Sequence, residues 1–540
     1  RREVIDGQQR LTTLQIMLKA VEQAIGSLSD ACEDEDEKKV IDTARRQVAK
    51  LTANDASDEE IYKVWPTNED RAPFAAVMGG TTAANPPAGP TLMAQAYAFF
   101  HGAAKEILAT GAPAEMARML SEAVRNYMRL IVLDLDQGDE PQAIFETLNA
   151  HGTPLLPADL IKNWLLWEAA RQKQDAAPLY EEHWRLFDRN PDYWRARRGA
   201  GHAARALVDT FLQNWLTKET GEVVSAKHLY DQFLRYAGRL RAQEAPAFSI
   251  KDLMASIHAD ALRFERIDRP TGKRRFDLFL ERLKRLDILV FHPLLLEVIA
   301  RTENDPEDAD KFCELLESYL VRRLVCGAQT RGYGTLSLTF LKAVRAQGDR
   351  RTSDVLRDTL LALEDSDEWP SDAEFQRNWI GRPFYGYFRR DRVLMILQAL
   401  EHRYQSANTK SEPLMTFDWS RLQIEHILPR SWEAHWPLPD NASAEDRKAK
   451  IHGIGNLTLV SQKLNPSLSN GPWLDPDAGK PGKRSGLHAH TMLMLNRKLL
   501  DGCQDNWSDA AIGKRAKQLF EDAKGIWPRC IDDKPSDDMD

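Results

Sequence analysis

At 540 residues the chain is longer than one hydrophobic core normally supports, so two or three domains are expected. Hydrophobic residues make up 43% and charged residues 29%, a globular composition that argues against extensive disorder. The formal net charge of −8 argues against a non-specific coat on nucleic acid, but it is compatible with an enzyme that binds DNA phosphates through a local basic groove. The longest apolar run, LDILVFHPLLL, is too short to span a bilayer, so no membrane partner is expected.

The five cysteines contain no CxxC pair, which indicates neither a disulfide framework nor a thiolate zinc site. This pattern favours a reducing compartment, and we expect a cytoplasmic protein. The first residues, RREVIDGQQR, contain no initiator Met and no signal segment. They are typical of the middle of a domain, so its start is expected upstream of Arg1.

The predicted elements begin with a short strand end and turn in VIDGQQR, followed by a helix over LTTLQIMLKAVEQAI with apolar residues at helical spacing. The stretch GGTTAANPPAGP predicts a surface loop, and LIVLDLD (130–136) predicts a strand. The segment EPQAIFETLNAHGTPLLPADLIKNWLLWEAA then predicts a helix, a tight turn at Gly152 and a second helix with Asp159 near its start.

Amphipathic helices are predicted for most of residues 193–363, with basic clusters at 195–198, 273–275 and Arg322-Arg323. Each cluster alone indicates a solvated helix face, whereas together they could line a DNA channel. After the acidic spacer LEDSDEWPSDAE, the segment FYGYFRRDRVLMILQALEHRY is predicted as a helix that leads into IEHILPR. The predicted domains are 1–192, 193–365 and 366–530, followed by an acidic tail at 531–540.

Three segments near the C-terminus carry the strongest chemical signal: IEHILPR, GIGNLTLV and KLNPSLSN. They contain His426, Asn456 and Asn465, with eight residues between the two asparagines. Hydrolysis of a phosphodiester needs a base that activates water and a cation that stabilises negative charge. A neutral imidazole suits the base, so His426 is assigned this role. Oxygen ligands suit Mg²⁺ or Mn²⁺, so Glu425 and Asn465 are the predicted metal ligands.

Each of these residues alone has a simpler interpretation, as a core histidine or a turn asparagine. The ordered set favours the catalytic interpretation. Four nearby histidines are interpreted as structural or surface residues, of which His452 is the first alternative: His435, His452, His488 and His490.

The order and spacing of His426, Asn456 and Asn465 resemble the HNH, or ββα-metal, nuclease motif. The variant with asparagine in place of the last histidine resembles the C-terminal domain of GmrSD-type type IV restriction enzymes. The pieces LSNGPW, NWSDAAIGKRAKQL and GIWP, with the region around Lys480 and Lys483, are also similar to that domain. The resemblance implies that Asn456 orients the loop and the base.

DGQQRLTTL is the second signal. A glycine turn followed by an arginine at a helix start lets backbone N–H groups and a guanidinium meet a phosphate. Alone, this pattern is more typical of a helix cap with a surface arginine. Together with IFETLNAHGTPLLPADLIKN, it resembles the ParB/sulfiredoxin-like domain of GmrSD-type proteins, which also occurs in Ssp effectors that sense phosphorothioated DNA.

This second resemblance implies binding and hydrolysis of a nucleoside triphosphate (GTP, CTP or UTP), as substrate or effector. In the second family string, Glu146, Asn149 and Asp159 either bind the nucleotide or hold the fold. Asp6 would place metal or water, and the predicted nucleotide-binding residues are Asp6, Gly7, Gln8, Gln9, Arg10 and Thr12.

The expected protein is multidomain and mainly α, with an N-terminal α+β ParB/sulfiredoxin-like domain, a helical middle region and a C-terminal ββα-metal domain with surrounding helices. The expected function is modification-dependent DNA restriction in anti-phage defence. Its partner would be glucosylated or phosphorothioated DNA, and a homo-oligomer or partner defence proteins are compatible. Whether it nicks or cuts both strands stays open. The alternatives are a non-catalytic DNA-modification sensor and a triphosphate-hydrolysing regulator with a degenerate HNH site.

Overall fold

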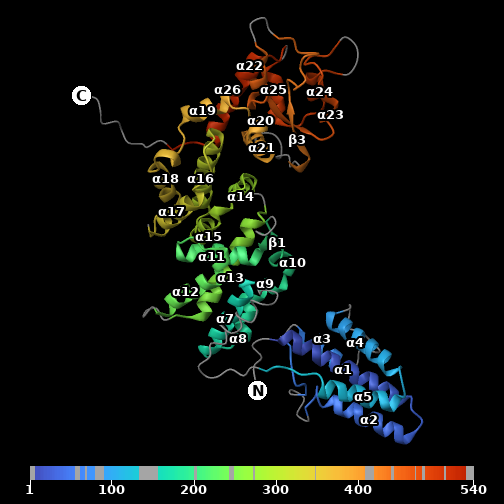
Figure 1. Cartoon of the computed structure of the whole chain (residues 1–540). Helices are drawn as coiled ribbons and strands as arrows, with labels where there is room; N and C mark the ends of the chain where they lie inside the picture. Colours follow the sequence, from blue (N-terminus) through green and yellow to red (C-terminus); the bar gives the residue numbers. More distant parts are fainter. Residues whose placement is uncertain are drawn as a thin grey trace. The chain divides into compact units, whose positions relative to one another are not determined.

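The computed structural model describes residues 7–530, except 55–60, 67–69, 80–90, 133–155, 200–203, 243–247, 272–273, 347, 408–418, 439–442, 469, 477–480 and 504–505. Its described elements are almost all helices (Figure 1). The chain divides into two compact units, Arg1–Leu155 and Leu156–Asp540. The predicted boundaries after residues 192 and 365 therefore both fall within the second unit. The multidomain, mainly helical architecture is confirmed.

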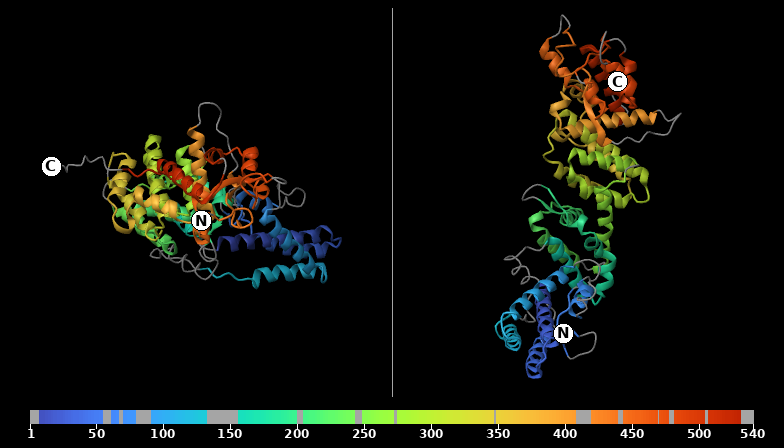
Figure 2. Two further views of the ribbon diagram at one scale, coloured as in Figure 1. Left: turned by 90° about the horizontal axis from the view of Figure 1, so that it is seen from above. Right: turned by 90° about the vertical axis from the view of Figure 1, so that its right-hand side faces the viewer.

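Four long helices of the first unit lie alongside one another (Figures 1 and 2), and α1 packs against both α2 and α4. Apolar residues at helical spacing form the shared core, among them Val21, Ile25 and Ile41, so the predicted helix after DGQQR is confirmed. The helices are α1 (Gln8–Asp30), α2 (Glu35–Ala49), α3 (Arg71–Met78), α4 (Leu92–Leu108) and α5 (Pro113–Asn126).

The described residues of the first unit form helices and one isolated bridge, between Ala53 and Tyr62. Of the predicted strand over 130–136, residues 130–132 lie in no regular element and are exposed, and the remainder lies outside the described residues. The strand end in VID, most of the loop over GGTTAANPPAGP, the helix after Glu140 and the turn at Gly152 also lie outside them. The ParB/sulfiredoxin-like character of this region stays a prediction.

The middle of the chain is helical, as predicted, and an aromatic core joins its first helices. Phe187, Trp194, Phe211 and Phe264 pack ring against ring, with centroids 4.9–5.7 Å apart in the Phe187–Trp194 and Trp194–Phe211 pairs. Strands β1 (Arg197–Arg198) and β2 (Arg205–Ala206) pair antiparallel. The helices are α7 (Pro157–Arg171), α8 (Ala176–Leu179), α9 (Arg185–Arg189), α10 (Pro191–Trp194), α11 (Leu207–Thr220), α12 (Leu229–Ala242), α13 (Ile250–Asp268), α14 (Arg275–Leu286), α15 (His292–Arg301), α16 (Pro306–Cys326), α17 (Tyr333–Ala346) and α18 (Thr352–Leu361).

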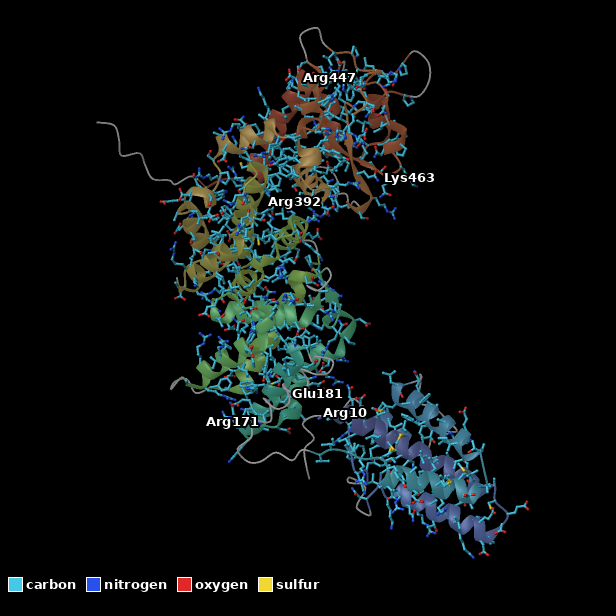
Figure 3. All side chains as sticks on the ribbon, viewed as in Figure 1. Arg10, Arg171, Glu181, Arg392, Arg447 and Lys463 are labelled. Atoms are coloured by element: carbon cyan, nitrogen blue, oxygen red, sulfur yellow. The ribbon has the colours of Figure 1, made fainter. Side chains whose placement is uncertain are left out.

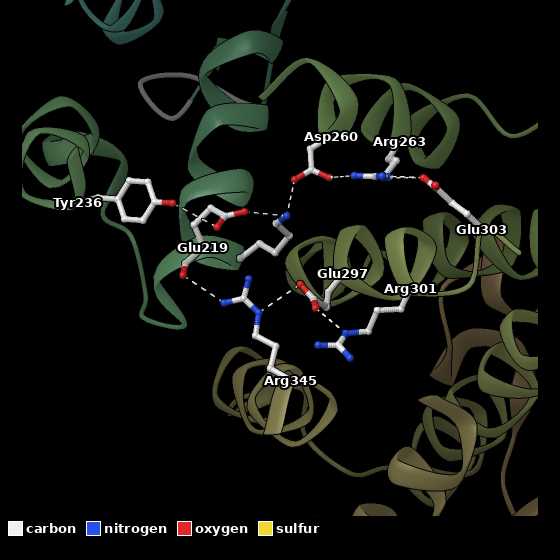
Figure 4. A network of polar contacts seen from close by, with 9 residues as sticks. Glu219, Tyr236, Asp260, Arg263, Glu297, Arg301, Glu303 and Arg345 are labelled. Atoms are coloured by element: carbon white, nitrogen blue, oxygen red, sulfur yellow. Dashed lines mark hydrogen bonds and ion pairs between the residues drawn. The ribbon is translucent and has the colours of Figure 1, made fainter. Parts of the chain in front are cut away.

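A buried network of charged residues links four of these helices (Figure 4). Lys218 of α11 pairs with Asp260 of α13 at 2.5 Å and with its neighbour Glu219 at 2.8 Å. Arg345 of α17 donates to the Glu219 carbonyl at 3.1 Å and to Glu297 of α15 at 3.2 Å. Because each buried charge meets an opposite charge, the network holds these helices in one arrangement.

The described residues of the C-terminal part form a two-stranded antiparallel sheet among helices. His426 lies opposite Leu457 in its register, and Glu425 lies opposite Thr458. The elements are α19 (Asp372–Gly381), α20 (Phe384–Tyr387), α21 (Arg390–Ala407), β3 (Leu422–His426), α22 (Ala444–Ile451), β4 (Leu457–Ser461), α23 (Asn465–Leu468), α24 (Lys483–His490), α25 (Met494–Gly502) and α26 (Asp509–Ile526).

The prediction of one helix over FYGYFRRDRVLMILQALEHRY was wrong at its start. The long helix α21 begins only at Arg390. Before it, Tyr385 has an extended backbone with ψ 126°, and Gly386 has φ 87°, in the left-handed region that favours glycine. This turn breaks the helix and brings Tyr385 to the end of β3.

Helix α16 forms hydrogen bonds with the residues that follow α26. The Trp527 indole donates to Glu317 at 2.8 Å, and its carbonyl accepts from Arg322 at 2.7 Å. Ser318 donates to the Pro528 carbonyl at 2.7 Å. Glu317 and Arg322 are fully buried, so these contacts satisfy groups that have no access to water.

The basic pair Arg322-Arg323 was predicted as a solvated face or part of a DNA channel, and both interpretations were wrong. The two side chains are 0% and 2% exposed, and both donate to backbone carbonyls. Helical periodicity alone does not show that these arginines face the core. No helix within the described ranges could cross a membrane.

Candidate active site

Glu425 and His426 are the last two residues of β3, so their side chains leave the strand on opposite faces. His426 is buried, with 8% of its surface exposed. Its ring atom Nε2 lies 3.3 Å from Nδ1 of His452, which follows α22. The structure therefore brings the predicted base together with the histidine that was its first alternative.

Tyr385 covers both imidazoles. Its ring meets the His426 ring edge-on, with centroids 4.6 Å apart, and stacks on the His452 ring at 5.8 Å. Its backbone N–H donates to the His452 carbonyl at 3.0 Å. These contacts fix the two rings from the turn that precedes α21.

Burial sets the charge of the two imidazoles. Burial, with the nearby His452, Arg430 and Lys483, lowers the pKa of His426 to about 3. Burial and Arg430 also lower the pKa of His452. Both rings are therefore neutral near pH 7, and only a neutral imidazole can accept a proton.

On the other face of β3, Glu425 pairs with the buried Lys483 at 2.6 Å. Lys483 also donates to the His426 carbonyl at 2.7 Å. Burial raises the pKa of Glu425 and lowers that of Lys483, although each opposes the shift of the other. Asn465, the first residue of α23, donates to Gln423 at 2.8 Å. Because Gln423 and Glu425 are two residues apart on β3, Asn465 lies toward the Glu425 face.

Asn456 is fully buried and its amide makes four hydrogen bonds. Its Oδ1 accepts from the Leu428 N–H at 2.8 Å and from the Trp507 indole at 3.1 Å. Its Nδ2 donates to the carbonyls of Leu428 at 2.8 Å and Ile451 at 2.9 Å. The side chain thus ties the exit of β3 to the residue before His452, an arrangement that suits an orienting role.

Gly455 of the GIGN segment allows a close helix approach. A Cβ at this position would lie 2.2 Å from the Ile512 carbonyl oxygen of α26. Arg515 of the same helix donates to the carbonyls of Gly455 and Leu457 at 2.8 Å. Helix α26 therefore supports the turn that places Asn456.

The oxygen donors of Glu425 and Asn465 suit a hard cation, but they would fill only part of its coordination shell. No group of three or more His, Cys, Asp and Glu side chains is arranged for a metal among the residues that the structure describes. A cation such as Mg²⁺ commonly takes one or two carboxylates and completes its shell with water and phosphate oxygens. Glu425 and Asn465 supply one carboxylate and one amide oxygen, provided that Lys483 releases the carboxylate.

Arg430 was quoted in the motif but given no role, and it lies beside the histidine pair. Its guanidinium carbon is 5.9 Å from the Tyr385 ring centroid, and its charge lowers the pKa of His426 and of His452. The side chain is exposed and pairs with no carboxylate among the described residues. An exposed guanidinium at this place could meet a phosphate.

Two other basic residues of this region, Arg447 and Lys463, differ in burial (Figure 3). Arg447 is buried, pairs with Asp509 at 3.1 Å and donates to the Trp436 carbonyl at 2.7 Å, so it holds the connection between the strands. Lys463, just after β4, is exposed. Of the remaining histidines, the following are exposed, as expected for surface residues: His435, His488 and His490.

The predicted nucleotide-binding segment opens α1. Gly7 precedes the helix with φ 89°, and the first turn contains no acidic residue. Arg10 is exposed (Figure 3), and its guanidinium lies 3.7 Å from the position that a Gly7 Cβ would take. Gln8 and Gln9 are exposed as well. Thr12 is 9% exposed and faces the interior.

Of the other N-terminal candidates, Asp6, Glu146 and Asn149 lie outside the described residues. Asp159, in the first turn of α7, forms a bidentate pair with Arg195 at 2.8 and 3.0 Å. A carboxylate occupied in this way favours the interpretation that Asp159 holds the fold.

Two family models match the chain. One describes the N-terminal domain of GmrSD restriction endonucleases and matches residues 1–166, and the other describes their C-terminal domain and matches residues 369–522. No curated protein matches the chain. Both models describe restriction endonuclease domains, so the class of protein is a nuclease whose target is DNA. The chain belongs to the GmrSD restriction endonuclease family, which confirms the resemblance seen in its motifs.

Proposed function

We propose that this chain is a modification-dependent, type IV-like restriction endonuclease of anti-phage defence. It hydrolyses DNA phosphodiesters by an HNH-type, metal-dependent reaction centred on His426. The main support for this proposal is the order of the site elements along the chain. A buried neutral imidazole and a carboxylate lie at the end of β3, β4 follows, and a helix then begins at Asn465. This order lies within the match to the C-terminal family model.

In this proposal His426 accepts a proton from the water that attacks phosphorus, and the phosphate bond to the leaving oxygen breaks. A divalent cation such as Mg²⁺ or Mn²⁺, bound by Glu425 and Asn465, would supply positive charge for the phosphate and the leaving oxygen. Arg430 binds a phosphate next to the imidazole. The negative phosphate then stabilises the protonated ring and offsets the effect of burial on the pKa of His426.

The direct test is cleavage of DNA by His426→Ala with Mg²⁺ or Mn²⁺. Loss of the base should reduce the rate roughly 10²- to 10⁴-fold. His490→Ala removes an exposed imidazole of the same domain and should cleave like the wild type. Equal rates for the wild type and His426→Ala would rule out this role.

The N-terminal unit would bind and hydrolyse a nucleoside triphosphate (GTP, CTP or UTP) and so regulate cleavage. The start of α1 supports this, because a helix N-terminus with an arginine in its first turn attracts phosphate. Arg10→Ala and Asp6→Ala should lose hydrolysis, which His426→Ala keeps. Arg118→Ala changes an exposed arginine of α5 and is the control. Triphosphate hydrolysis at the wild-type rate in Arg10→Ala would rule out a role of Arg10 in nucleotide binding.

The DNA mark is the remaining part of the proposal, with glucosylated or phosphorothioated DNA as the substrates. Incubation of the protein with unmodified, glucosylated and phosphorothioated DNA, with and without each triphosphate, tests it. Cleavage confined to one modified DNA would support modification dependence, whereas equal cleavage of all three would oppose it. The same reactions, followed by size-exclusion chromatography, would reveal a homo-oligomer or a need for partner defence proteins.

A second candidate is a DNA-modification sensor or triphosphate-hydrolysing regulator whose HNH site is degenerate. The pairing of Glu425 with Lys483 favours it, because an ammonium occupies the predicted metal-binding carboxylate. Calorimetric titration with Mg²⁺ and Mn²⁺ separates the two candidates. A nuclease must bind one of these ions at the site, and a sensor need bind neither.

A further inference from the structure

The contact between His426 and His452 restricts where the protons of both rings can lie. His426 Nε2 and His452 Nδ1 are 3.3 Å apart, within hydrogen-bond distance. A neutral imidazole carries one proton on one nitrogen and a lone pair on the other. A hydrogen bond at this distance requires that one of the two facing nitrogens donates to the other, because two facing lone pairs would repel.

Only one of the two arrangements leaves His426 able to act as a base. If His452 donated, His426 Nε2 would accept and the His426 proton would lie on Nδ1, which leaves no lone pair for a water molecule. If His426 Nε2 donates, His452 Nδ1 accepts, and the lone pair of His426 Nδ1 stays available. No described residue hydrogen-bonds to His426 Nδ1.

Three neighbours hold His452 in place for this contact. The Tyr385 N–H donates to its carbonyl at 3.0 Å, and the Tyr385 ring stacks on its imidazole at an interplanar angle of 15°. Asn456 binds the carbonyl of the preceding Ile451. The following residue, Gly453, forms a bridge with Pro383. The position of the second imidazole thus depends on the turn before α21 and on the segment GIGN (453–456).

We propose that His452 is a positioning residue of the nuclease reaction: its Nδ1 accepts the Nε2 proton of His426 and so presents His426 Nδ1 to the attacking water. The inference rests on the proposed function, because it assigns a partner to the same base. His452 does not touch the substrate in this role. It fixes the tautomer and the ring orientation of His426, as groups that hydrogen-bond to a functional imidazole do in other sites.

Two substitutions of His452 in the full chain separate the hydrogen bond from ring packing. His452→Phe keeps a ring that can stack on Tyr385 but has no acceptor. His452→Asn loses the ring but places an amide oxygen close to the former Nδ1 position. We expect kcat to fall roughly 10- to 100-fold in His452→Phe with little change in KM, whereas His452→Asn stays within a few-fold of the wild type.

The rates are measured with saturating Mn²⁺ on the DNA that the wild type cleaves, and thermal unfolding shows whether each variant is folded. Activity in His452→Phe with loss in His452→Asn would identify packing as the role and overturn the proposal. Equal rates in the two folded variants, high or low, would also overturn it. If His426→Ala cleaves like the wild type, the proposed function itself fails. If His426→Ala is inactive but His452→Phe is active, only the positioning role fails.

Discussion

Two buried lysines of the second unit each pair with a buried carboxylate, but their pKa values move in opposite directions. Burial alone would lower the pKa of Lys218 in the helical network, but Asp260 and Glu219 outweigh it and raise the pKa. Burial also lowers the pKa of Lys483, and there Glu425 alone does not compensate. The two pKa values differ in direction because Lys218 meets two carboxylates and Lys483 meets one.

The comparison separates a strongly held ion pair from a weakly held one. The raised pKa keeps Lys218 ionised, and its ion pairs join α11 to α13. In the site, burial shifts the pKa values of both Lys483 and Glu425 toward their neutral forms, so that pair is held less strongly. A weakly held carboxylate can be transferred to another cation at low cost, and this is what a metal site at Glu425 requires.

The largest expected effect is on the network. Lys218→Met leaves the buried Asp260 and the half-buried Glu219 with less positive charge, so we expect the free energy of unfolding of the second unit to fall by about 3–5 kcal/mol. Guanidinium unfolding followed by tryptophan fluorescence measures it. Lys311→Met removes an exposed pair of α16 and should change stability by less than about 1 kcal/mol. Similar losses of unfolding free energy in Lys218→Met and Lys311→Met would show that the buried network stabilises the unit no more than an exposed ion pair does.

Asp209 extends the comparison to a buried carboxylate that accepts a backbone N–H, from Ala158 at 3.0 Å. Burial raises the pKa of Asp209 from 3.8 to about 6. A raised pKa means that the folded state binds the proton more tightly, so its contribution to stability is lost as pH rises from about 4 to 6. Asp209→Asn keeps the acceptor, so we expect a gain of about 1–3 kcal/mol at pH 8 and little at pH 4. Asp231→Asn, at an exposed position of α12, should show no such pH-dependent gain.

Lys483→Met tests the weaker pair. It should cost about 1–2 kcal/mol, less than Lys218→Met, because Glu425 can take up a proton when the ammonium is absent. It should also bind Mn²⁺ more tightly in calorimetric titration, since the metal no longer competes with Lys483 for the carboxylate. Weaker Mn²⁺ binding than in the wild type would argue against Glu425 as a ligand.

Arg430→Gln carries the smallest effect. Loss of one phosphate contact should raise KM a few-fold with kcat nearly constant, and reduce the slope of log affinity against log salt by about 1. Lys311→Gln is the control. An unchanged salt slope in Arg430→Gln would show that this guanidinium does not bind DNA.

Local sequence patterns were enough to predict the local structure around His426 and before Asn456. The apolar segment around His426, which Pro429 ends, is typical of a strand, and Gly-Ile-Gly is typical of a turn before Asn456. The structure has a strand that ends at His426 and a tight turn over Ile454–Asn456. Helical periodicity likewise predicted the helical middle region. These features depend on residues that are close in the chain.

The missed features depend on contacts between distant residues. Lys483 reaches Glu425 from 58 positions away, and Tyr385 reaches His426 only because Gly386 breaks the expected helix. Arg322 faces the core because Trp527 meets it there, 205 positions later. Periodicity shows that a residue lies on one face of a helix but not what covers that face.

The contact of Trp527 and Pro528 with α16 sets a lower limit on any fragment that is expected to fold. The match to the C-terminal family model ends at residue 522, four residues before the end of α26. A fragment cut at that point would lack the indole and the carbonyl that satisfy Glu317 and Arg322, two side chains with no exposure to water. Trimming the nuclease end at the family boundary would therefore loosen the helical middle region, although the deleted residues lie two hundred positions further along the chain.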